Sequence, residues 1–367
     1  MTAKRRNLLD ALPRSVVILL SSLVAIVIAL LICGVILLVT GKDPIAAYRT
    51  ILETGATGTK LLETLKRSTP LILSACAVAI GFKMNLFNIG VEGQYLFAAL
   101  IAAESATHIS APPIVHVTVV LLIACAAGAF WASIAAFLKI TRGINEVIST
   151  IMLNFISLSV MQWLFDNYMR DDSDGGLRVT TTEIKPSGRI PDIVSGRLNG
   201  MWLIALFVVF CYWLLVFRSK FGFRLRSSGL NSTAAQTAGI AANRMIIVSM
   251  LLSGAVAGLV AMQSVLGEEY AYGPQATPTQ FGFAGIAVAL LGRNHPIGIV
   301  VAAMLFGFTD STSAVLQLSG IPNSIVKVIQ AVVVITVVIV NEATSRYMNH
   351  RTAEQTAAAL RAEKVGV

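Results

Sequence analysis

Long apolar runs separated by short polar segments dominate the pattern of this chain. Because roughly 20 apolar residues in a helix cross a hydrocarbon core of about 30 Å, the pattern predicts about ten transmembrane helices. The clear runs cover about 15–40, 114–138, 145–165, 201–217, 245–266 and 324–341. The weaker runs contain Gly, Asn or Pro, and they cover about 62–81, 88–107, 279–292 and 296–315. We therefore expect an all-α fold, a polytopic transmembrane helical bundle of roughly 8–10 spans.

Composition agrees with a membrane protein, since 56% of residues are hydrophobic and 13% are charged. A soluble domain carries about 25% charged residues. The net charge of +9 raises the question of a nucleic-acid partner. However, the basic residues lie in small groups between apolar runs, which is typical of topology signals. We expect a multi-pass protein surrounded by membrane lipids, with no nucleic acid bound.

The basic N-terminus tests both targeting and topology. Lys4, Arg5 and Arg6 precede an apolar run that is longer than the roughly 7–15 residues of a signal-peptide core. That run is therefore predicted to remain as the first helix. Basic residues also concentrate in the segments that lie inside when the N-terminus is cytoplasmic, such as 218–226. The positive-inside rule thus predicts that both termini are cytoplasmic.

Polar segments divide the chain further. We predict a transmembrane permease domain over 1–341 and a cytoplasmic tail over 342–367. Within the domain, 166–200 is predicted to lie outside and 218–244 inside, each long enough to meet a partner. The stretch Asp43–Gly55 is read equally well as a short surface helix or as a connector.

Broken apolar pairs around Gly81–Gly93 and Gly282–Gly298 indicate an internal repeat. An offset of five spans would invert the two halves, which is a recurrent transporter plan. Laying the broken pairs directly over each other gives an offset of six and equal orientation. Both arrangements stay open.

The segment Asn85–Gln94 places four polar side chains in a membrane-embedded run. A carboxylate at the bilayer centre costs about 2.5–3.5 kcal/mol on insertion scales, so Glu92 is expected to face protein or a water-filled cavity. If the segment is helical, Asn85, Asn88 and Glu92 share one face. Lining of the solute pathway or a hinge is one reading. Capping is the other, in which Asn88 and Gly90 begin a helix and Glu92 neutralises its positive end. The pathway candidates are Asn85, Asn88, Glu92, Gln94 and Asn154.

A second polar set, Asn145, Glu146, Asn154 and Gln162, lies on the run 145–165. For Asn154 and Gln162 we favour interhelical hydrogen bonds over solute contact, since this is the usual role of amides in membrane bundles.

The predicted inner loop contains a short run of small residues. Asn231 or Ser232 is expected to cap a short helix that Gly239 ends. Docking into a partner's groove and an ordinary surface helix are equally compatible with this pattern. Gly254 and Gly258 form a GxxxG pattern, which permits close helix packing.

Catalytic patterns are missing from the sequence. The four histidines are scattered, and neither an HExxH motif nor a GxxxxGK[ST] phosphate loop is present. The four cysteines lie inside apolar runs, at spacings that fit neither a disulfide framework nor a zinc site. We expect a transport protein that is not an enzyme, needs no cofactor, and relies on another chain for any ATP hydrolysis.

These motifs carry a family resemblance over about residues 15–341. The segment Phe87–Gln94, following Pro70–Leu73, resembles the signature of bacterial ABC importer permeases of the simple-sugar and nucleoside branch. The inner loop and the Ser253–Gly258 segment resemble that branch's coupling region, and Ile144–Asn154 resembles its nucleoside-import subset. The residues that match the coupling region are Gly229, Asn231, Ala234, Ala235 and Gly239.

The resemblance implies a type II-like ABC importer permease that pairs with a homologous permease or with itself. It also implies ABC ATPase subunits below the membrane, docked on the coupling segment, and an extracytoplasmic substrate-binding protein above. Nucleosides are the expected cargo, ahead of simple sugars such as ribose, and riboflavin-like ring compounds are a further alternative. An ion-coupled secondary transporter acting alone is the alternative of a different class.

Overall fold

The computed structural model describes residues 14–365, except 56, 174–177, 275, 276, 278 and 319. The basic residues Lys4, Arg5 and Arg6 therefore lie outside the described part. The chain divides into two compact units, one of residues 1–53 and 313–367 and the other of residues 54–312.

The first unit contains α1 (Arg14–Val39), α2 (Pro44–Gly55, whose last two residues belong to the second unit) and α14 (Asn323–Val365). Its small core consists of five residues, Leu37, Ala47, Leu316, Ile321 and Val326. The hydroxyl of Tyr48 on α2 donates to the carbonyl oxygen of Leu30 on α1 at 2.6 Å. For Asp43–Gly55 the sequence predicted a helix and a connector equally well, and the structure shows the helix α2. α14 continues past residue 341 without a break, so the predicted start of the tail is not a helix end.

The second unit contains most of the bundle. Its helices are α3 (Gly58–Lys83), α4 (Val91–His108), α5 (Pro113–Arg142), α6 (Glu146–Leu164), α7 (Met201–Trp213), α8 (Lys220–Leu230), α9 (Ser232–Thr237), α10 (Ala242–Gly258), α11 (Met262–Gly267), α12 (Phe281–Leu291) and α13 (Pro296–Leu318), the last running on into the first unit. Two π-helical turns, η2 (Phe165–Met169) and η4 (Leu214–Arg218), extend α6 and α7.

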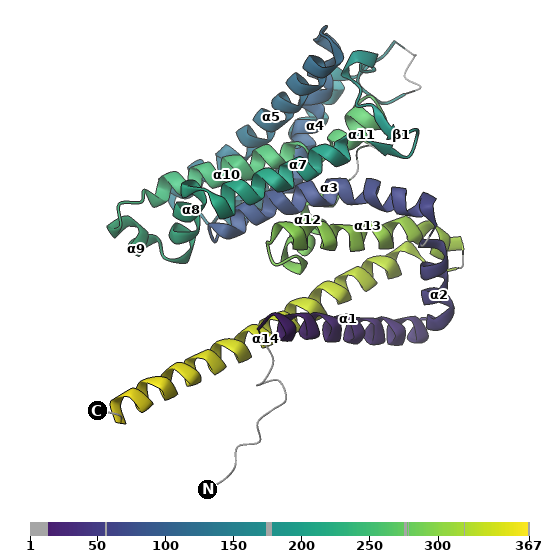
Figure 1. Cartoon of the computed structure of the whole chain (residues 1–367). Coiled ribbons are helices and arrows are strands. Elements are labelled where there is room, and N and C mark those ends of the chain that lie inside the picture. Colours follow the sequence, from purple (N-terminus) through teal and green to yellow (C-terminus); the bar gives the residue numbers. More distant parts are fainter. Residues whose placement is uncertain are drawn as a thin grey trace. The chain divides into compact units, whose positions relative to one another are not determined.

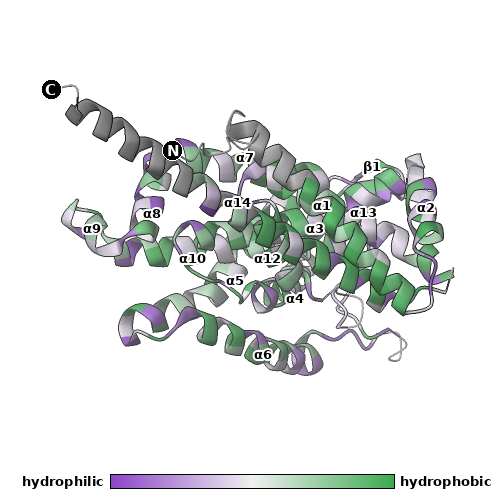
Figure 2. Cartoon of the chain, turned by 90° about the horizontal axis from the view of Figure 1, so that it is seen from below, coloured by the Kyte–Doolittle hydropathy of each residue, from purple (hydrophilic) through white to green (hydrophobic). Residues whose placement is uncertain are grey.

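Apolar residues dominate the long helices, as the hydropathy colours of Figure 2 show. Within the described residues, seven helices are long and apolar enough to cross a membrane. The expected all-α, multi-pass class is therefore confirmed. α12 and the Val27–Val39 part of α1 are apolar but shorter. The number of spans and the internal repeat stay predictions.

Close packing of α5 and α10 depends on glycine. A Cβ atom on Gly254 would overlap the side chain of Ala132 and the carbonyl of Gly128. One on Gly258 would overlap the carbonyl of Ala124. The backbones thus approach so closely that no side chain fits between them, which confirms the close packing predicted from the GxxxG pattern.

Two sets of short elements lie at opposite ends of the second unit's long helices (Figure 1). α8 and α9 lie at one end, and α11 with β1 (Asp192–Val194) lies at the other. β1 pairs antiparallel with β2 (Leu198–Asn199) in a small hairpin. The segment before this hairpin contains the short 3-10 helix η3 (Pro186–Gly188), and its Ile184 N–H donates to the carbonyl oxygen of Tyr270 at 2.7 Å. The part of the predicted outer loop from Thr181 to Ile190 therefore packs on the bundle.

Candidate functional site

The turn between α3 and α4 explains the first pathway candidate. Asn85 has a φ of 59°, and its N–H donates to the carbonyl oxygen of Phe82. The next N–H, of Leu86, donates to the carbonyl oxygen of Gly81. This pattern is a Schellman cap, in which asparagine is one of the few residues that tolerate the left-handed conformation. The shared helical face predicted for Asn85, Asn88 and Glu92 is therefore wrong, because the chain leaves the helix at Met84 and Asn85 is exposed.

Asn88 and Gln94 form a reciprocal amide pair inside the bundle. The Asn88 Nδ2 donates to Gln94 Oε1 at 3.0 Å, and Gln94 Nε2 donates back to Asn88 Oδ1 at 2.9 Å. Asn88 Nδ2 also donates to Ser253 Oγ on α10 at 2.8 Å, and its Oδ1 accepts the Gly90 N–H. The predicted role of Asn88 and Gly90 in starting α4 is confirmed, since Gly90 is the N-terminal cap residue. The pair also ties this helix start to α10.

Asn154 joins α6 to the same turn. Its Nδ2 donates to the carbonyl oxygen of Ile89 at 3.0 Å, and its Oδ1 accepts the Gly93 N–H at 2.8 Å. The predicted interhelical bonds of Asn154 are confirmed. For Gln162 the prediction is wrong, because its amide donates to Asp166 four residues further along the chain, on an exposed face.

Glu92 binds the start of a second helix besides the one predicted. Its carboxylate accepts the backbone N–H groups of Gln280 and, at 2.8 Å, of Gly282, where α12 begins. It also accepts the Tyr95 hydroxyl at 2.8 Å. Glu92 therefore caps α12 through hydrogen bonds, and it also lies in the first turn of α4, near the positive end of its own helix as predicted.

The length of α12 explains why this cap is internal. With 11 residues it is about 16 Å long, roughly half the thickness of a hydrocarbon core. A helix that starts inside the bundle leaves N–H groups away from water, and these need acceptors. Glu92, 9% exposed, provides them.

The structure thus brings together four of the five pathway candidates. We call Asn88, Glu92, Gln94 and Asn154 the polar cluster, and all four are buried. Asn88 and Gln94 bond to each other, whereas Glu92 and Asn154 bond mainly to backbone groups. Their contact with solute stays a prediction.

A cavity of about 500 Å³ opens elsewhere in the second unit. It lies where the run predicted as one helix over 245–266 is broken between α10 and α11. The predicted span is found as one apolar segment, Ala242–Gly267, and at Leu259–Ala261 it passes through hydrogen-bonded turns that separate α10 from α11. Residues just before and in α11, including Ala261 and Gln263, line the cavity together with residues from α3, α12 and α13.

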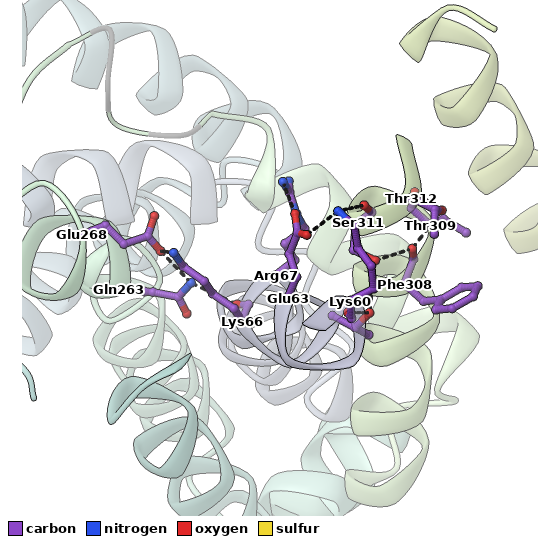
Figure 3. A network of polar contacts seen from close by, with 11 residues as sticks. Lys60, Glu63, Lys66, Arg67, Gln263, Glu268, Phe308, Thr309, Ser311 and Thr312 are labelled. Carbon is purple, nitrogen blue, oxygen red and sulfur yellow. Dashed lines mark hydrogen bonds and ion pairs between the residues drawn. The ribbon is translucent and has the colours of Figure 1, made fainter. Parts of the chain in front are cut away.

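Charged and amide side chains meet at this cavity, as Figure 3 shows. Lys66 on α3 pairs with Glu268 at 3.4 Å. Gln263 Nε2 lies between them, donating to the Lys66 carbonyl oxygen and to Glu268 Oε1, both at 3.0 Å. On the next turn of α3, Glu63 accepts from Lys60 and from Arg67.

Sequence reasoning missed all of these cavity residues. A usable signal was present, since Glu63, Lys66 and Arg67 lie at the start of the apolar run 62–81. Ionisable residues inside a membrane-spanning run mark functional sites more often than chance. Within the described part of the chain, no cluster of His, Cys, Asp or Glu is arranged to hold a metal ion.

The predicted cap of the short inner helix is confirmed. Asn231 precedes α9, and its Oδ1 accepts the Ala234 N–H at 3.0 Å. Gly239 ends the segment with a φ of 79°, as expected for a left-handed terminating residue.

The residues of the coupling segment, defined as Gly229–Gly239, differ in what they contact. Ala235 is 4% exposed and packs within the chain, whereas Ala234 is exposed. A Cβ atom on Gly229 would lie 2.7 Å from the Lys83 carbonyl oxygen and 2.9 Å from Met84 Cα. The coupling segment therefore rests directly on the turn that leads from α3 to the polar cluster.

A bundle of apolar helices with a buried polar cluster and a cavity lined in part by charged residues is typical of a membrane transport protein. The family model described as the permease component of the branched-chain amino acid transport system matches residues 60–338. The chain belongs to this permease family.

Three relatives align with most of the chain. It is 36% identical to the guanosine ABC transporter permease protein NupP of Bacillus subtilis, over 87% of this chain and 92% of that protein. It is 32% identical to the nucleoside ABC transporter permease protein NupB of Lactococcus lactis, over 85% and 88% respectively. It is 31% identical to the glucose ABC transporter permease protein TsgB13 of Haloferax volcanii, over 84% and 83%.

Proposed function

We propose that this chain is the membrane-spanning permease subunit of an ATP-driven nucleoside importer. The observation that carries the proposal is its similarity to the guanosine permease NupP along nearly the whole of both chains. The nucleoside permease NupB supports the same cargo. The similarity to the glucose permease TsgB13 keeps simple sugars as the second candidate.

ATP hydrolysis belongs to partner subunits in this proposal. The coupling segment is the docking site for an ABC ATPase, since α9 is short, its end is defined by Gly239, and its surface at Ala234 and Gln236 is exposed. A second permease, either related or identical, completes the pore. A substrate-binding protein meets the opposite face, where the packed residues from Thr181 to Ile190 lie.

The proposed orientation places both termini in the cytoplasm. The α8–α9 end then faces the cytoplasm, which agrees with the basic side chains Lys220, Arg224 and Arg226 on α8. The β1–β2 hairpin lies at the outer face.

The contacts supply a route for alternating access. Movement of the coupling segment would displace the end of α3 through the Gly229 contact. The adjoining turn carries Asn88, and α4 carries Glu92, which holds the start of α12. Because Phe281 at the start of α12 lines the cavity, ATP-driven motion of α8 and α9 would reach the cavity wall.

Uptake of radiolabelled guanosine and glucose tests the proposal. The chain is produced in cells together with a candidate ATPase, binding protein and second permease from the same organism. We expect ATP-dependent guanosine uptake that needs every subunit. Glucose uptake without guanosine uptake would overturn the cargo, and ion-driven uptake by vesicles containing this chain alone would overturn the class.

A further inference from the structure

We propose that the 500 Å³ cavity inside the single chain is a binding station for the transported solute, and that it selects an uncharged ring compound bearing hydroxyl groups, such as a nucleoside. This inference rests on the proposed function. It places a solute-binding step within one permease chain, between α3, the α10–α11 break and α12. Four observations carry it.

The first observation is the size of the cavity and the composition of its wall. About 500 Å³ falls inside the range of roughly 300–1,000 Å³ that small-molecule sites occupy. Pro70, Val260, Ala261 and Phe281 contribute apolar surface to the wall. Charged and amide groups occupy the remainder, which is the usual composition of a site that holds a small polar molecule in one orientation.

The second observation is the balance of charges on the cavity wall. Three basic residues line the cavity, Lys66, Arg67 and Arg197, and so do three acidic residues, Glu63, Glu268 and Asp310. Lys66 pairs with Glu268, and Arg67 pairs with Glu63. Because the acidic and basic groups are equal in number, the wall has no net positive charge to offset the negative charge of a phosphorylated solute. Carboxylate oxygens and ammonium groups together suit hydroxyl groups, which both donate and accept.

The third observation is the amide oxygen of Gln263, which has no hydrogen-bond partner among the described residues. Gln263 is 6% exposed, and its Nε2 makes two hydrogen bonds. Its Oε1 is buried. A buried acceptor without a donor is costly, and a rotation of the Gln263 side chain, which lines the cavity, would turn Oε1 toward a hydroxyl or ring N–H of a bound solute.

The fourth observation is the aromatic side chain of Phe281, whose backbone is held in place by hydrogen bonds. Phe281 lines the cavity at the first residue of α12. The Ser74 hydroxyl donates to its carbonyl oxygen at 2.7 Å, and Glu92 binds the N–H groups of the residues on either side. Its backbone is therefore fixed on α3 and α4. A planar base stacks favourably on such a ring, whereas a sugar has no aromatic face to offer.

A smaller cavity of about 250 Å³ adjoins the first. The two share four lining residues, Lys66, Gly196, Arg197 and Glu268. The smaller cavity reaches β1, β2 and Tyr270. The Lys66–Glu268 pair therefore stands between the hairpin side and the binding station, on the route by which solute would enter.

Photolabelling of the assembled importer with 8-azidoguanosine tests the station directly. After illumination, mass spectrometry locates the labelled peptides. We expect label on peptides from α3, the α10–α11 region or the start of α12, with loss of label when excess guanosine is present. Excess glucose or guanosine monophosphate should not compete.

Matched variants separate binding from folding. Gln263→Leu should raise the Kd for the probe up to about tenfold, since it removes one hydrogen bond to solute, and should thus lower labelling about fivefold at the concentration that half-saturates the wild type. Gln162→Leu, at an exposed position on α6, should leave labelling unchanged. Phe281→Leu should lower it, and Phe281→Tyr should retain it. If Gln263→Leu does not accumulate in membranes, the partly exposed Glu268→Gln serves in its place, with its exposed neighbour Glu269→Gln as control.

The outcomes distinguish this inference from the proposed function. Guanosine uptake by the wild-type importer, together with label outside this cavity or label insensitive to Gln263→Leu and Glu268→Gln, would overturn the station and leave the function standing. Absence of both guanosine uptake and label would overturn both. Label at these peptides that glucose displaces as well as guanosine would overturn the selection for a base.

Discussion

The carboxylate of Glu92 accepts the backbone N–H of Gly282 at 2.8 Å, although 190 positions separate the two residues in the chain. The contact is so close that a Cβ atom on Gly282 would lie 2.7 Å from the Glu92 backbone nitrogen. One carboxylate therefore fixes the start of a helix that begins inside the bundle. Both the polar cluster and the cavity wall depend on this contact, because Phe281 lies between the two capped N–H groups.

Replacing Glu92 should destabilise the chain and impair transport together. Glu92→Ala removes the acceptor for two N–H groups and for the Tyr95 hydroxyl. We expect a loss of about 1–3 kcal/mol in the free energy of unfolding, the usual cost of buried groups left unpaired. Glu92→Gln keeps one acceptor oxygen and should lose less. Thermal unfolding in detergent measures both. Glu104→Gln on the same helix, where the partner His108 is exposed, is the control.

If Glu92→Ala and Glu104→Gln lower the free energy of unfolding equally, Glu92 does not act as the cap of α12. Uptake at the wild-type rate in Glu92→Ala would also contradict the prediction.

Close packing of α5 on α10 gives a second prediction. Gly254→Ala forces a methyl group against Ala132 and the Gly128 carbonyl, where no flexible side chain can yield. Overpacking of this kind costs about 1–3 kcal/mol, and we expect a lower midpoint of thermal unfolding. Gly58→Ala, at the start of α3 with open space around the new methyl group, is the control. It should be neutral or slightly stabilising, since alanine favours helix by about 1 kcal/mol over glycine. A midpoint for Gly254→Ala equal to that of Gly58→Ala would refute the packing argument.

Sequence predicted the helices well, because membrane insertion depends on the local density of apolar residues. It predicted the ends of α9 for a similar reason, since the Asn231 cap and the Gly239 terminator act within a few residues. The hydrogen-bond donors that Glu92 binds could not be predicted from the local sequence. The sequence shows a carboxylate that needs donors, while the donors lie at the start of α12 and depend on how the helices pack.

The break between α10 and α11 was hidden for a related reason. The run 245–266 is apolar and contains no proline, and its glycines Gly254 and Gly258 are already explained by close helix packing, so the end of α10 at Gly258 is not marked separately. Gln263 was read as part of that span. Its importance appears only once Lys66 and Glu268 lie beside it and its Oε1 is left without a partner in the described structure.

The contact between Gly229 and α3 predicts a variant that docks the ATPase but transmits its motion poorly. Gly229→Val would push α8 away from Lys83 and Met84, while the exposed surface of α9 keeps its shape. We expect the ATPase to co-purify at the wild-type level, with guanosine uptake lowered severalfold and ATP hydrolysis no longer stimulated by the loaded binding protein. Gly239→Ala is unsuitable as a control because of its positive φ, so Ser232→Ala, exposed beside the Asn231 cap, is used. Wild-type uptake in Gly229→Val would disprove the link.

Two adjacent alanines separate folding of the coupling segment from docking. Ala235 is buried within the chain, so Ala235→Leu should lower stability by about 1–3 kcal/mol through overpacking. Ala234 is exposed, so Ala234→Leu should leave the unfolding midpoint unchanged and lower co-purification of the ATPase. Measuring both quantities on both variants tests the assignment of faces. If Ala235→Leu keeps full stability but no longer co-purifies with the ATPase, while Ala234→Leu still does, then the buried and docking faces have been assigned the wrong way round.

The ion pair of Lys66 and Glu268 provides the last prediction, on entry to the cavity. The two side chains are 30% and 32% exposed and lie 3.4 Å apart, so their attraction is partly screened by solvent. Lys66→Glu places two carboxylates together, and Glu268→Lys places two ammonium groups together; each should lower guanosine uptake at least severalfold. The exchanged double variant restores opposite charges at the same positions and should recover a large part of the lost uptake. Double-mutant analysis of initial rates measures this coupling directly. Arg49→Glu and Glu53→Arg, in an exposed pair on α2, provide a matched exchange that should leave uptake unchanged throughout. Additive losses at Lys66 and Glu268, with no recovery in the exchanged variant, would show that the two residues act separately and that their pair does not control entry.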